Sequence, residues 1–83
     1  MGTKLFIGSL PWSVNDAELK TLFEPYGNVQ SAKVITDKQT RRSKGFGFVE
    51  FETEAQASAA INALNESEVK GRKIVVSQAK SKN

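Results

Sequence analysis

Apolar and polar residues alternate along several short segments of the chain, which is the pattern of β-strands with one buried face. In Lys4–Ser9, Leu5 and Ile7 fall on one side of the predicted strand and Phe6 falls on the other. Further strands are predicted at Val29–Thr36, Lys44–Glu52 and Arg72–Gln78. A polar loop, 37–43, separates the second strand from the third.

Two intervening segments have the spacing of amphipathic helices. Asn15 and Glu18 match a capping box, and Gly27 ends the segment that follows. The apolar residues of this first helix recur at i, i+3, i+4 and i+7: Leu19, Leu22, Phe23 and Tyr26. Thr53 and Gln56 match a second capping box. The apolar stripe of the second helix consists of Ala57, Ala60, Ile61 and Leu64.

The order of these elements is βαββαβ, which predicts an α+β protein of the ferredoxin-like, split βαβ type. Such a fold has a four-stranded antiparallel sheet with two helices on one face. The 83 residues fit a single domain, 1–83. We expect its core to span about 4–80 and residues 81–83 to form a flexible tail.

The third predicted strand places phenylalanines and charged residues on the same side. Its even positions are Lys44, Phe46, Phe48 and Glu50, and its odd positions are Gly45, Gly47, Val49 and Phe51. Because burying Lys44 and Glu50 is unfavourable, the even side faces water and the glycines lie under the helices. With Phe6 of the first strand, three aromatic rings face solvent. An exposed apolar surface of this size indicates an interaction site.

Composition limits the chemistry available to the chain. It contains no cysteine and no histidine, which excludes disulfides, catalysis by either side chain and the common zinc sites. No apolar run approaches the roughly 20 residues of a membrane helix, and the start lacks the pattern of a signal peptide. We therefore expect an intracellular protein without membrane contact.

Positive charge is concentrated at one loop and at the end of the chain, although the net charge is only +3. The basic residues there are Lys38, Arg41, Arg42, Lys44, Lys80 and Lys82. Such clustering favours a polyanionic partner. Exposed rings beside cations suit single-stranded nucleic acid, whose bases stack on aromatic faces while basic side chains neutralise phosphates.

The same residues match a sequence motif. Lys44–Phe51, KGFGFVEF, fits every position of the ribonucleoprotein octapeptide K/R-G-F/Y-G/A-F-V-x-F/Y. Leu5–Leu10, LFIGSL, resembles the partner hexapeptide on the first strand. The chain therefore resembles a single RNA recognition motif domain. In that family the first and third strands are the central pair of the sheet, and two or three bases stack there.

The resemblance implies roles for individual residues. Phe6 and Phe48 would each stack a base, Phe46 would pack against sugars, and Lys44 would pair with a phosphate. The chain leaving the fourth strand, Gln78 to Lys80, would hydrogen-bond base edges.

Two further observations add candidate binding residues: the alternation along the strands, and the loop with which family members commonly hold the bound strand. Lys4, Lys33 and Ile35 are expected beside the rings, and Arg41 and Arg42 lie in the loop that commonly clasps the bound strand. For Trp12, which follows Pro11, covering a helix end is favoured over contacting a base.

Two positions depart from the family pattern. Ser9 stands where asparagine is usual, which could change a loop contact but leaves the stacking ring intact. Arg41 replaces a frequent glycine, which raises the charge but removes a residue that tolerates positive φ. Either the loop turns differently or Arg41 is strained.

Three alternatives stay open. A protein-interaction domain on the same fold would bind peptides through its helices, but all three rings are present here. A small phosphatase would need a phosphate-cradling loop and a nucleophile with a base, and we identify none in the sequence. Single-stranded DNA is an alternative ligand, because stacking is indifferent to the sugar. We expect a monomer that is not an enzyme, has no cofactor or metal, and is cytoplasmic, or nuclear if it belongs to a larger eukaryotic protein.

Overall fold

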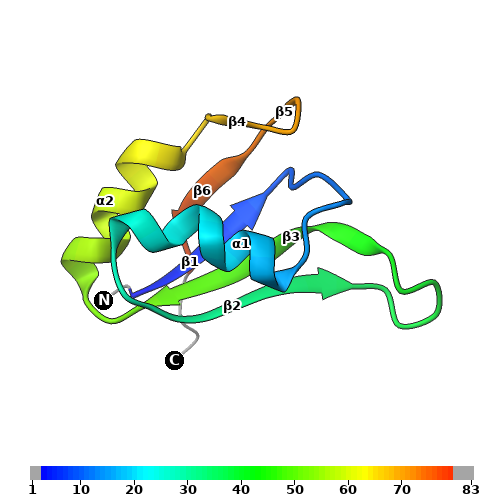
Figure 1. Cartoon of the computed structure of the whole chain (residues 1–83), viewed down its shortest axis with the longest axis horizontal. Coiled ribbons are helices and arrows are strands. Elements are labelled where there is room, and N and C mark those ends of the chain that lie inside the picture. The colour runs from blue at the N-terminus through cyan, green and yellow to red at the C-terminus, as the bar shows by residue number, and fades with distance from the viewer. Residues whose placement is uncertain (1–2, 80–83) are drawn as a thin grey trace.

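A computed structural model describes residues 3–79 of the chain. Its sheet is antiparallel, in the order β2-β3-β1-β6, and both α-helices cover the same face (Figure 1). The sheet strands are β1 (Lys4–Gly8), β2 (Val29–Thr36), β3 (Ser43–Phe51) and β6 (Val75–Gln78), and the helices are α1 (Asp16–Phe23) and α2 (Glu54–Leu64). The predicted fold class is confirmed. Lys80 and the tail 81–83 lie outside the described residues.

The first helix begins as predicted but ends earlier. Asn15 Oδ1 accepts a hydrogen bond from the Glu18 backbone N–H at 2.9 Å, and Glu18 Oε1 accepts one from the Asn15 N–H at 3.3 Å, which closes the capping box. The last predicted turn is instead a 3₁₀ turn, η1 (Glu24–Tyr26). Pro25 explains the change, because it lacks an N–H and its ring clashes with the preceding turn of an α-helix.

The second helix is capped by a different arrangement from the one predicted. Thr53 Oγ1 accepts a hydrogen bond from the Gln56 backbone N–H at 3.2 Å, as expected. Gln56 Oε1, however, accepts a hydrogen bond from the backbone N–H of Asn28 at 3.2 Å. Gln56 therefore ties the start of α2 to the start of β2 rather than closing a capping box.

The predicted fourth strand, Arg72–Gln78, is wrong in its first half. Its start forms a two-stranded hairpin outside the main sheet, made of β4 (Glu68–Val69) and β5 (Arg72–Lys73). Lys70 and Gly71 form the turn with φ of 49° and 86°, and positive φ at both central residues is typical of the tight hairpin turn. Ile74 then bonds through its backbone to Glu66 and Ser67, so the main sheet is joined only from Val75.

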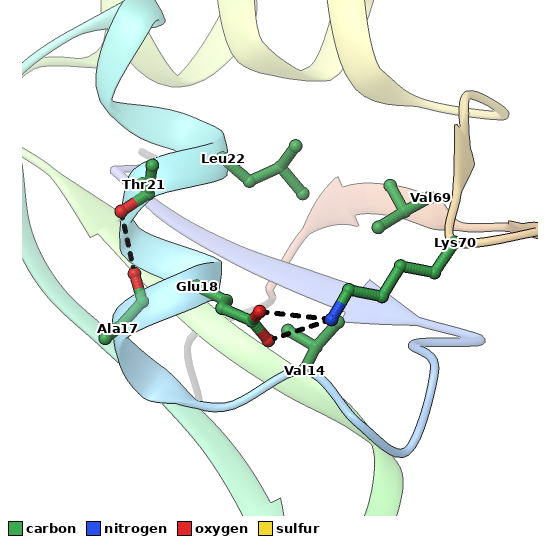
Figure 2. Close-up of a pocket in the computed structure, with 7 residues that line it drawn as sticks. All are labelled: Val14, Ala17, Glu18, Thr21, Leu22, Val69 and Lys70. Carbon is green, nitrogen blue, oxygen red and sulfur yellow. Dashed lines mark hydrogen bonds and ion pairs between the residues drawn. The ribbon is translucent and has the colours of Figure 1, made fainter.

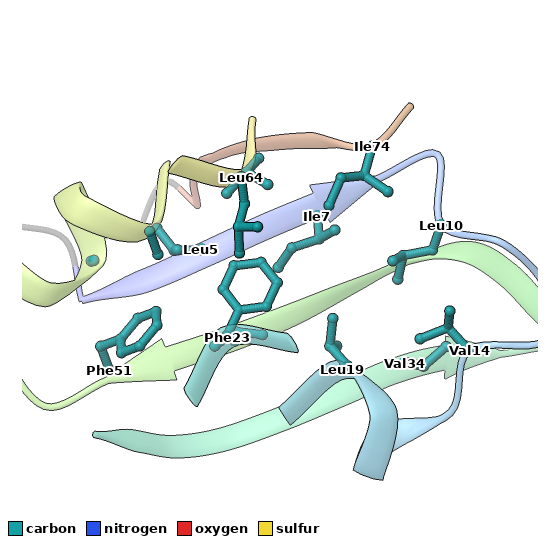
Figure 3. Close-up of a cluster of buried hydrophobic side chains, with 14 residues drawn as sticks. Leu5, Ile7, Leu10, Val14, Leu19, Phe23, Val34, Phe51, Leu64 and Ile74 are labelled. Atoms are coloured by element: carbon teal, nitrogen blue, oxygen red, sulfur yellow. The ribbon is translucent and has the colours of Figure 1, made fainter. Parts of the chain in front are cut away.

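The hydrophobic core lies between the helices and the covered face of the sheet (Figure 3). The helices and the sheet each contribute an aromatic ring to this core. The ring centroids of Phe23 on α1 and Phe51 on β3 are 6.2 Å apart. The fully buried large side chains are Phe23, Phe51, Leu5, Ile7, Leu10, Leu19, Ile74, Val49 and Val76. The core therefore takes the odd positions of β1 and β3, as the sequence predicts.

The two glycines of the octapeptide have different roles. Gly47 is buried, and a Cβ built on it would lie 2.5 Å from the Lys33 carbonyl oxygen and 3.3 Å from Leu19 Cδ2. This is the close packing expected under α1. Gly45 has a φ of 87° and lies against Leu10 and Trp12 of the loop after β1 rather than under a helix. The prediction holds for Gly47 but not for Gly45.

Gly47→Ala is expected to lower the free energy of unfolding by about 1–3 kcal/mol, because the added methyl group meets the backbone of β2. Urea denaturation followed by circular dichroism measures the change. Ser58→Ala, on the exposed side of α2, is the control and is expected to change stability by less than about 0.5 kcal/mol. Equal stabilities of the two variants would contradict the close approach at Gly47.

Candidate nucleic-acid interface

Three phenylalanine rings form a cluster on the uncovered face of the sheet. Phe6 on β1 lies directly opposite Phe48 on β3, and Phe46 lies opposite Gly8. The ring centroids are 5.7 Å apart for Phe6–Phe46 and for Phe6–Phe48, and 6.3 Å apart for Phe46–Phe48. We call Phe6, Phe46 and Phe48 the aromatic platform. All three rings are half-buried, so part of each contacts solvent.

The backbone of two adjacent strands places this platform. β1 and β3 are the central pair of the sheet, and residues directly opposite each other in an antiparallel pair lie on the same face. Leu5 pairs with Val49, and both are fully buried under the helices. Phe6 and Phe48, the next pair, must therefore point to the open face.

Predicted cationic neighbours lie beside the platform. Lys33 on β2 pairs with Phe48, which places the two side chains on the same face. Lys4 Nζ lies 5.2 Å from the centroid of the Phe48 ring, within the range of a cation–π contact. Lys44 is exposed at the start of β3, and Ile35, two residues after Lys33 on β2, is half-buried.

One acidic residue shares the open face. Glu50 pairs with Lys4 on β1 and with Ser31 on β2, and its Oε2 accepts a hydrogen bond from Thr3 Oγ1 at 3.4 Å. The end of the platform near Lys4 therefore carries both a positive and a negative side chain. Lys33 and Lys44 add positive charge on the β2 and β3 side, and Lys44 lies close enough to Asp37 to interact with it electrostatically.

The loop between β2 and β3 folds around one carboxylate. Asp37 Oδ1 accepts hydrogen bonds from the backbone N–H groups of Gln39 at 2.8 Å and Thr40 at 3.3 Å. The Asp37 N–H donates to the carbonyl of Arg42 at 2.8 Å, and the Arg41 N–H donates to the carbonyl of Asp37 at 2.7 Å. Arg41 has a φ of 62°. The loop therefore keeps a left-handed position at Arg41, which costs a non-glycine residue roughly 1–2 kcal/mol.

The fourth strand of the sheet contributes residues that the sequence reasoning missed. Val75 pairs with Gly8 and Ser77 pairs with Phe6, so both lie on the open face. Gln78 pairs with the buried Leu5, and its side chain leaves the strand on the helix side, while its backbone stays at the sheet edge. Lys80 is outside the described residues. The signal in the sequence is the alternation along β6, which puts Val75 and Ser77 on the face opposite the buried Val76.

The helix side carries an apolar groove that was not predicted. It lies between α1 and the β4–β5 hairpin, has a volume of about 350 Å³ and is lined by Val14, Ala17, Glu18, Thr21, Leu22, Val69 and Lys70 (Figure 2). Lys70 Nζ crosses it to the Glu18 carboxylate, with distances of 3.0 and 3.2 Å to the two oxygens. This hydrogen bond lowers the pKa of Glu18 below its usual value. Sequence reasoning missed the groove because Val69 and Lys70 belong to the unpredicted hairpin.

Residues 3–79 contain no cluster of three or more acidic or other metal-ligating side chains arranged to hold an ion. Neither helix within that range is long and apolar enough to span a bilayer.

Known proteins are similar to this chain in both sequence and fold. Residues 5–75 match the RNA recognition motif family. The mitochondrial glycine-rich RNA-binding protein 2 of Arabidopsis thaliana is 51% identical over 79 residues, which cover 95% of this chain and 50% of that protein. The chain spans about half the length of the curated relatives it matches.

Solved structures of RNA-binding proteins have the same fold as this chain. The crystal structure of RNA-binding protein PG1 superposes with a TM-score of 0.92 at 43% identity and covers 98% of each chain. A Sxl-lethal protein–RNA complex superposes with a TM-score of 0.93 at 31% identity, covering 100% of this chain and 50% of that one.

Protonation of Asp37 is expected to open the loop between β2 and β3. Backbone hydrogen bonds, first from Gln39 and then from Thr40, lower the pKa of Asp37 below its usual 3.8. Because the folded pKa is the lower one, the loop is fully ordered above the unfolded value and loses order as pH falls through the folded value. An NMR titration should show the Gln39 and Thr40 amides shifting together below pH 3.8.

Asp37→Asn, which keeps an acceptor oxygen but does not titrate, is the control for this titration. Its Gln39 and Thr40 amide shifts should stay constant over the same pH range. A wild-type midpoint at or above 3.8 would contradict the assignment.

Proposed function

Because the chain belongs to the RNA recognition motif family, we propose that it binds single-stranded RNA across the open face of its sheet. The observation that carries the proposal is the aromatic platform, in which three phenylalanine centroids lie 5.7–6.3 Å apart. Each base stacked on such a ring contributes roughly 1–3 kcal/mol of binding free energy. The names of the relatives describe binding, which supports a binding module rather than an enzyme.

Each ring has a distinct role in this proposal. Phe6 and Phe48 belong to adjacent strands and stack two successive bases. Phe46, whose plane is nearly perpendicular to that of Phe48 at 88°, packs against the sugars between them. Ser77, opposite Phe6 on β6, is placed to hydrogen-bond the edge of the base on that ring.

In this proposal Lys4 covers an aromatic ring in the free protein and contacts a phosphate in the complex. In the free protein its ammonium group lies over the Phe48 ring, where a base would stack. A bound base displaces Lys4, which then pairs with an adjacent phosphate. Lys33 and Lys44 neutralise phosphates on the β2 and β3 side, and Arg41 and Arg42 clasp the strand from the loop.

A single platform covers only a few nucleotides, so we propose modest affinity for this domain alone. Single-stranded DNA would bind through the same rings, and only contacts to the 2′-hydroxyl would favour RNA. The monomeric state and the cytoplasmic location stay predictions. Two relatives are named mitochondrial, so localisation experiments should include organelles.

Phe48→Ala and Phe6→Ala should each weaken binding to a fluorescent random-sequence single-stranded RNA by roughly 5- to 150-fold, because each removes one stacking surface. Fluorescence anisotropy measures the affinity. Leu22→Ala truncates a half-buried apolar side chain in the helix-side groove and is the matched control. A loss of RNA affinity in Leu22→Ala alone would reject the platform and indicate that RNA binds at the helix-side groove.

Lys33→Ala should weaken binding and reduce the salt dependence by about 0.7 in the slope of log K against log salt, the value for one phosphate contact on a single strand. Lys20→Ala removes another exposed lysine, on α1, and should leave both quantities unchanged. Equal slopes for wild type and Lys33→Ala would show that Lys33 contacts no phosphate.

A further inference from the structure

Within residues 3–79 the main sheet has two edge strands, β2 and β6. The backbone N–H and C=O groups on the outer side of an edge strand can pair with a strand of another molecule. Extended peptides and second copies of a domain add a strand to a sheet in this way. In this protein, side chains from the ends of the two helices bond to backbone groups of both edge strands.

Asp16 occupies the outer side of β2. Its Oδ1 accepts a hydrogen bond from the Val34 backbone N–H at 2.7 Å, and the start of α1 lies beside β2 (Figure 1). Val34 pairs with Gly47 of β3, and alternate residues of an antiparallel strand direct their backbone groups away from the partner strand. Since the Val34 N–H donates to α1 and not to β3, it belongs to the outward set. An incoming strand would need this N–H for its own carbonyl oxygen, and the Asp16 carboxylate repels such an oxygen.

Two irregularities shorten the regular part of β2. Its register with β3 shifts between Val29 and Ser31, and again between Val34 and Thr36. Bulges disturb the spacing of the outward backbone groups, and natural proteins protect sheet edges with them. The regular part of the edge is therefore 31–34, and Asp16 closes one end of it.

Asn65, at the C-terminal end of α2, has the same role on β6. Its Oδ1 accepts a hydrogen bond from the Val76 backbone N–H at 2.9 Å. Two residues earlier, the Ile74 N–H donates to the Ser67 carbonyl at 2.9 Å, and the Ile74 carbonyl accepts the Glu66 N–H at 2.8 Å. This edge is therefore covered at two successive outward positions, so it depends less on a single side chain than β2 does.

We propose that Asp16 and Asn65 are edge guards, which keep the sheet from pairing edge to edge with a second copy of this chain. Loss of the Asp16 contact opens β2, and two copies then pair their β2 strands antiparallel about a two-fold axis. β2 is the more vulnerable edge because it has eight residues, against four in β6. The inference concerns self-association and is independent of the proposed RNA binding. It gives a physical cause for the expected monomer.

Sedimentation velocity of the purified chain over a range of concentrations tests the guard on β2. Asp16→Ala should show an apparent mass that rises with concentration toward that of a dimer, because the Val34 N–H is freed for pairing. Wild type and Asp16→Asn, which keeps an acceptor oxygen in the same place, should stay monomeric. Asn65→Ala should associate less than Asp16→Ala, because residues 66–67 still bond to Ile74.

Glu54→Ala is the matched control for effects on helix stability. Asp16 and Glu54 each occupy the first position of a helix, where a negative charge interacts favourably with the helix dipole. If Glu54→Ala and Asp16→Ala associate equally, weakened helices and not an opened edge cause the association, and the proposal is overturned. A wild type that is itself dimeric, or an Asp16→Ala variant that stays monomeric at every concentration, would also overturn it.

Hydrogen exchange of the Val34 amide gives a second readout that needs no association. In wild type this amide should be protected although it lies on an edge strand. In Asp16→Ala at low concentration it should exchange at least about tenfold faster, since a hydrogen bond to a charged group is lost. Circular dichroism establishes that each variant is folded. If the wild-type Val34 amide exchanges as rapidly as an exposed amide, Asp16 does not guard the edge, whatever the variants do.

Discussion

The packing of both helices against one face of the sheet determines the rest of this molecule. Side chains on β1 and β3 alternate, so the residues that fill the core leave their neighbours on the uncovered face. Leu5, Ile7, Val49 and Phe51 are buried, and the intervening Phe6 and Phe48 must lie outside. A slip of one residue between these strands would bring the rings inward and the core residues outward. The core therefore sets the register that presents the platform.

Much of this arrangement could be predicted from the sequence. The two strands of the platform have strong alternation, and burying Lys44 and Glu50 is so unfavourable that their side of β3 could be assigned with no structure. The first capping box involves residues three apart, so local sequence is enough to identify it. These particular patterns are local, and the fold keeps them unchanged.

Other features depend on contacts between distant segments, and the sequence did not reveal them. Ile74 leaves the predicted strand because its backbone bonds to residues 66–67. Gln56 bonds to Asn28 rather than to its own helix end. Trp12 follows an apolar stretch, and only the folded loop shows that its ring stays in water. The two possibilities left open for Arg41 were decided by the hydrogen bonds of the turn around Asp37.

The open face combines rings that favour stacking with cations that are already close to them. Lys4 rests on the ring of Phe48 and beside Glu50, so the free protein shields part of its apolar surface until a ligand arrives. Such a contact is weak at an exposed site, about 0.5–1 kcal/mol, and a base that stacks more strongly can replace it. The rings of the platform are thereby kept available for a ligand while part of their surface is covered.

The most direct test of the central claim is an NMR measurement of contacts between the protein and a short single-stranded RNA. We expect nuclear Overhauser effects from the ring protons of Phe6 and Phe48 to base protons, and upfield shifts of those base protons caused by the ring currents. Contacts confined to the groove between α1 and the β4–β5 hairpin, with the ring protons of the platform unaffected, would contradict binding on the open face of the sheet.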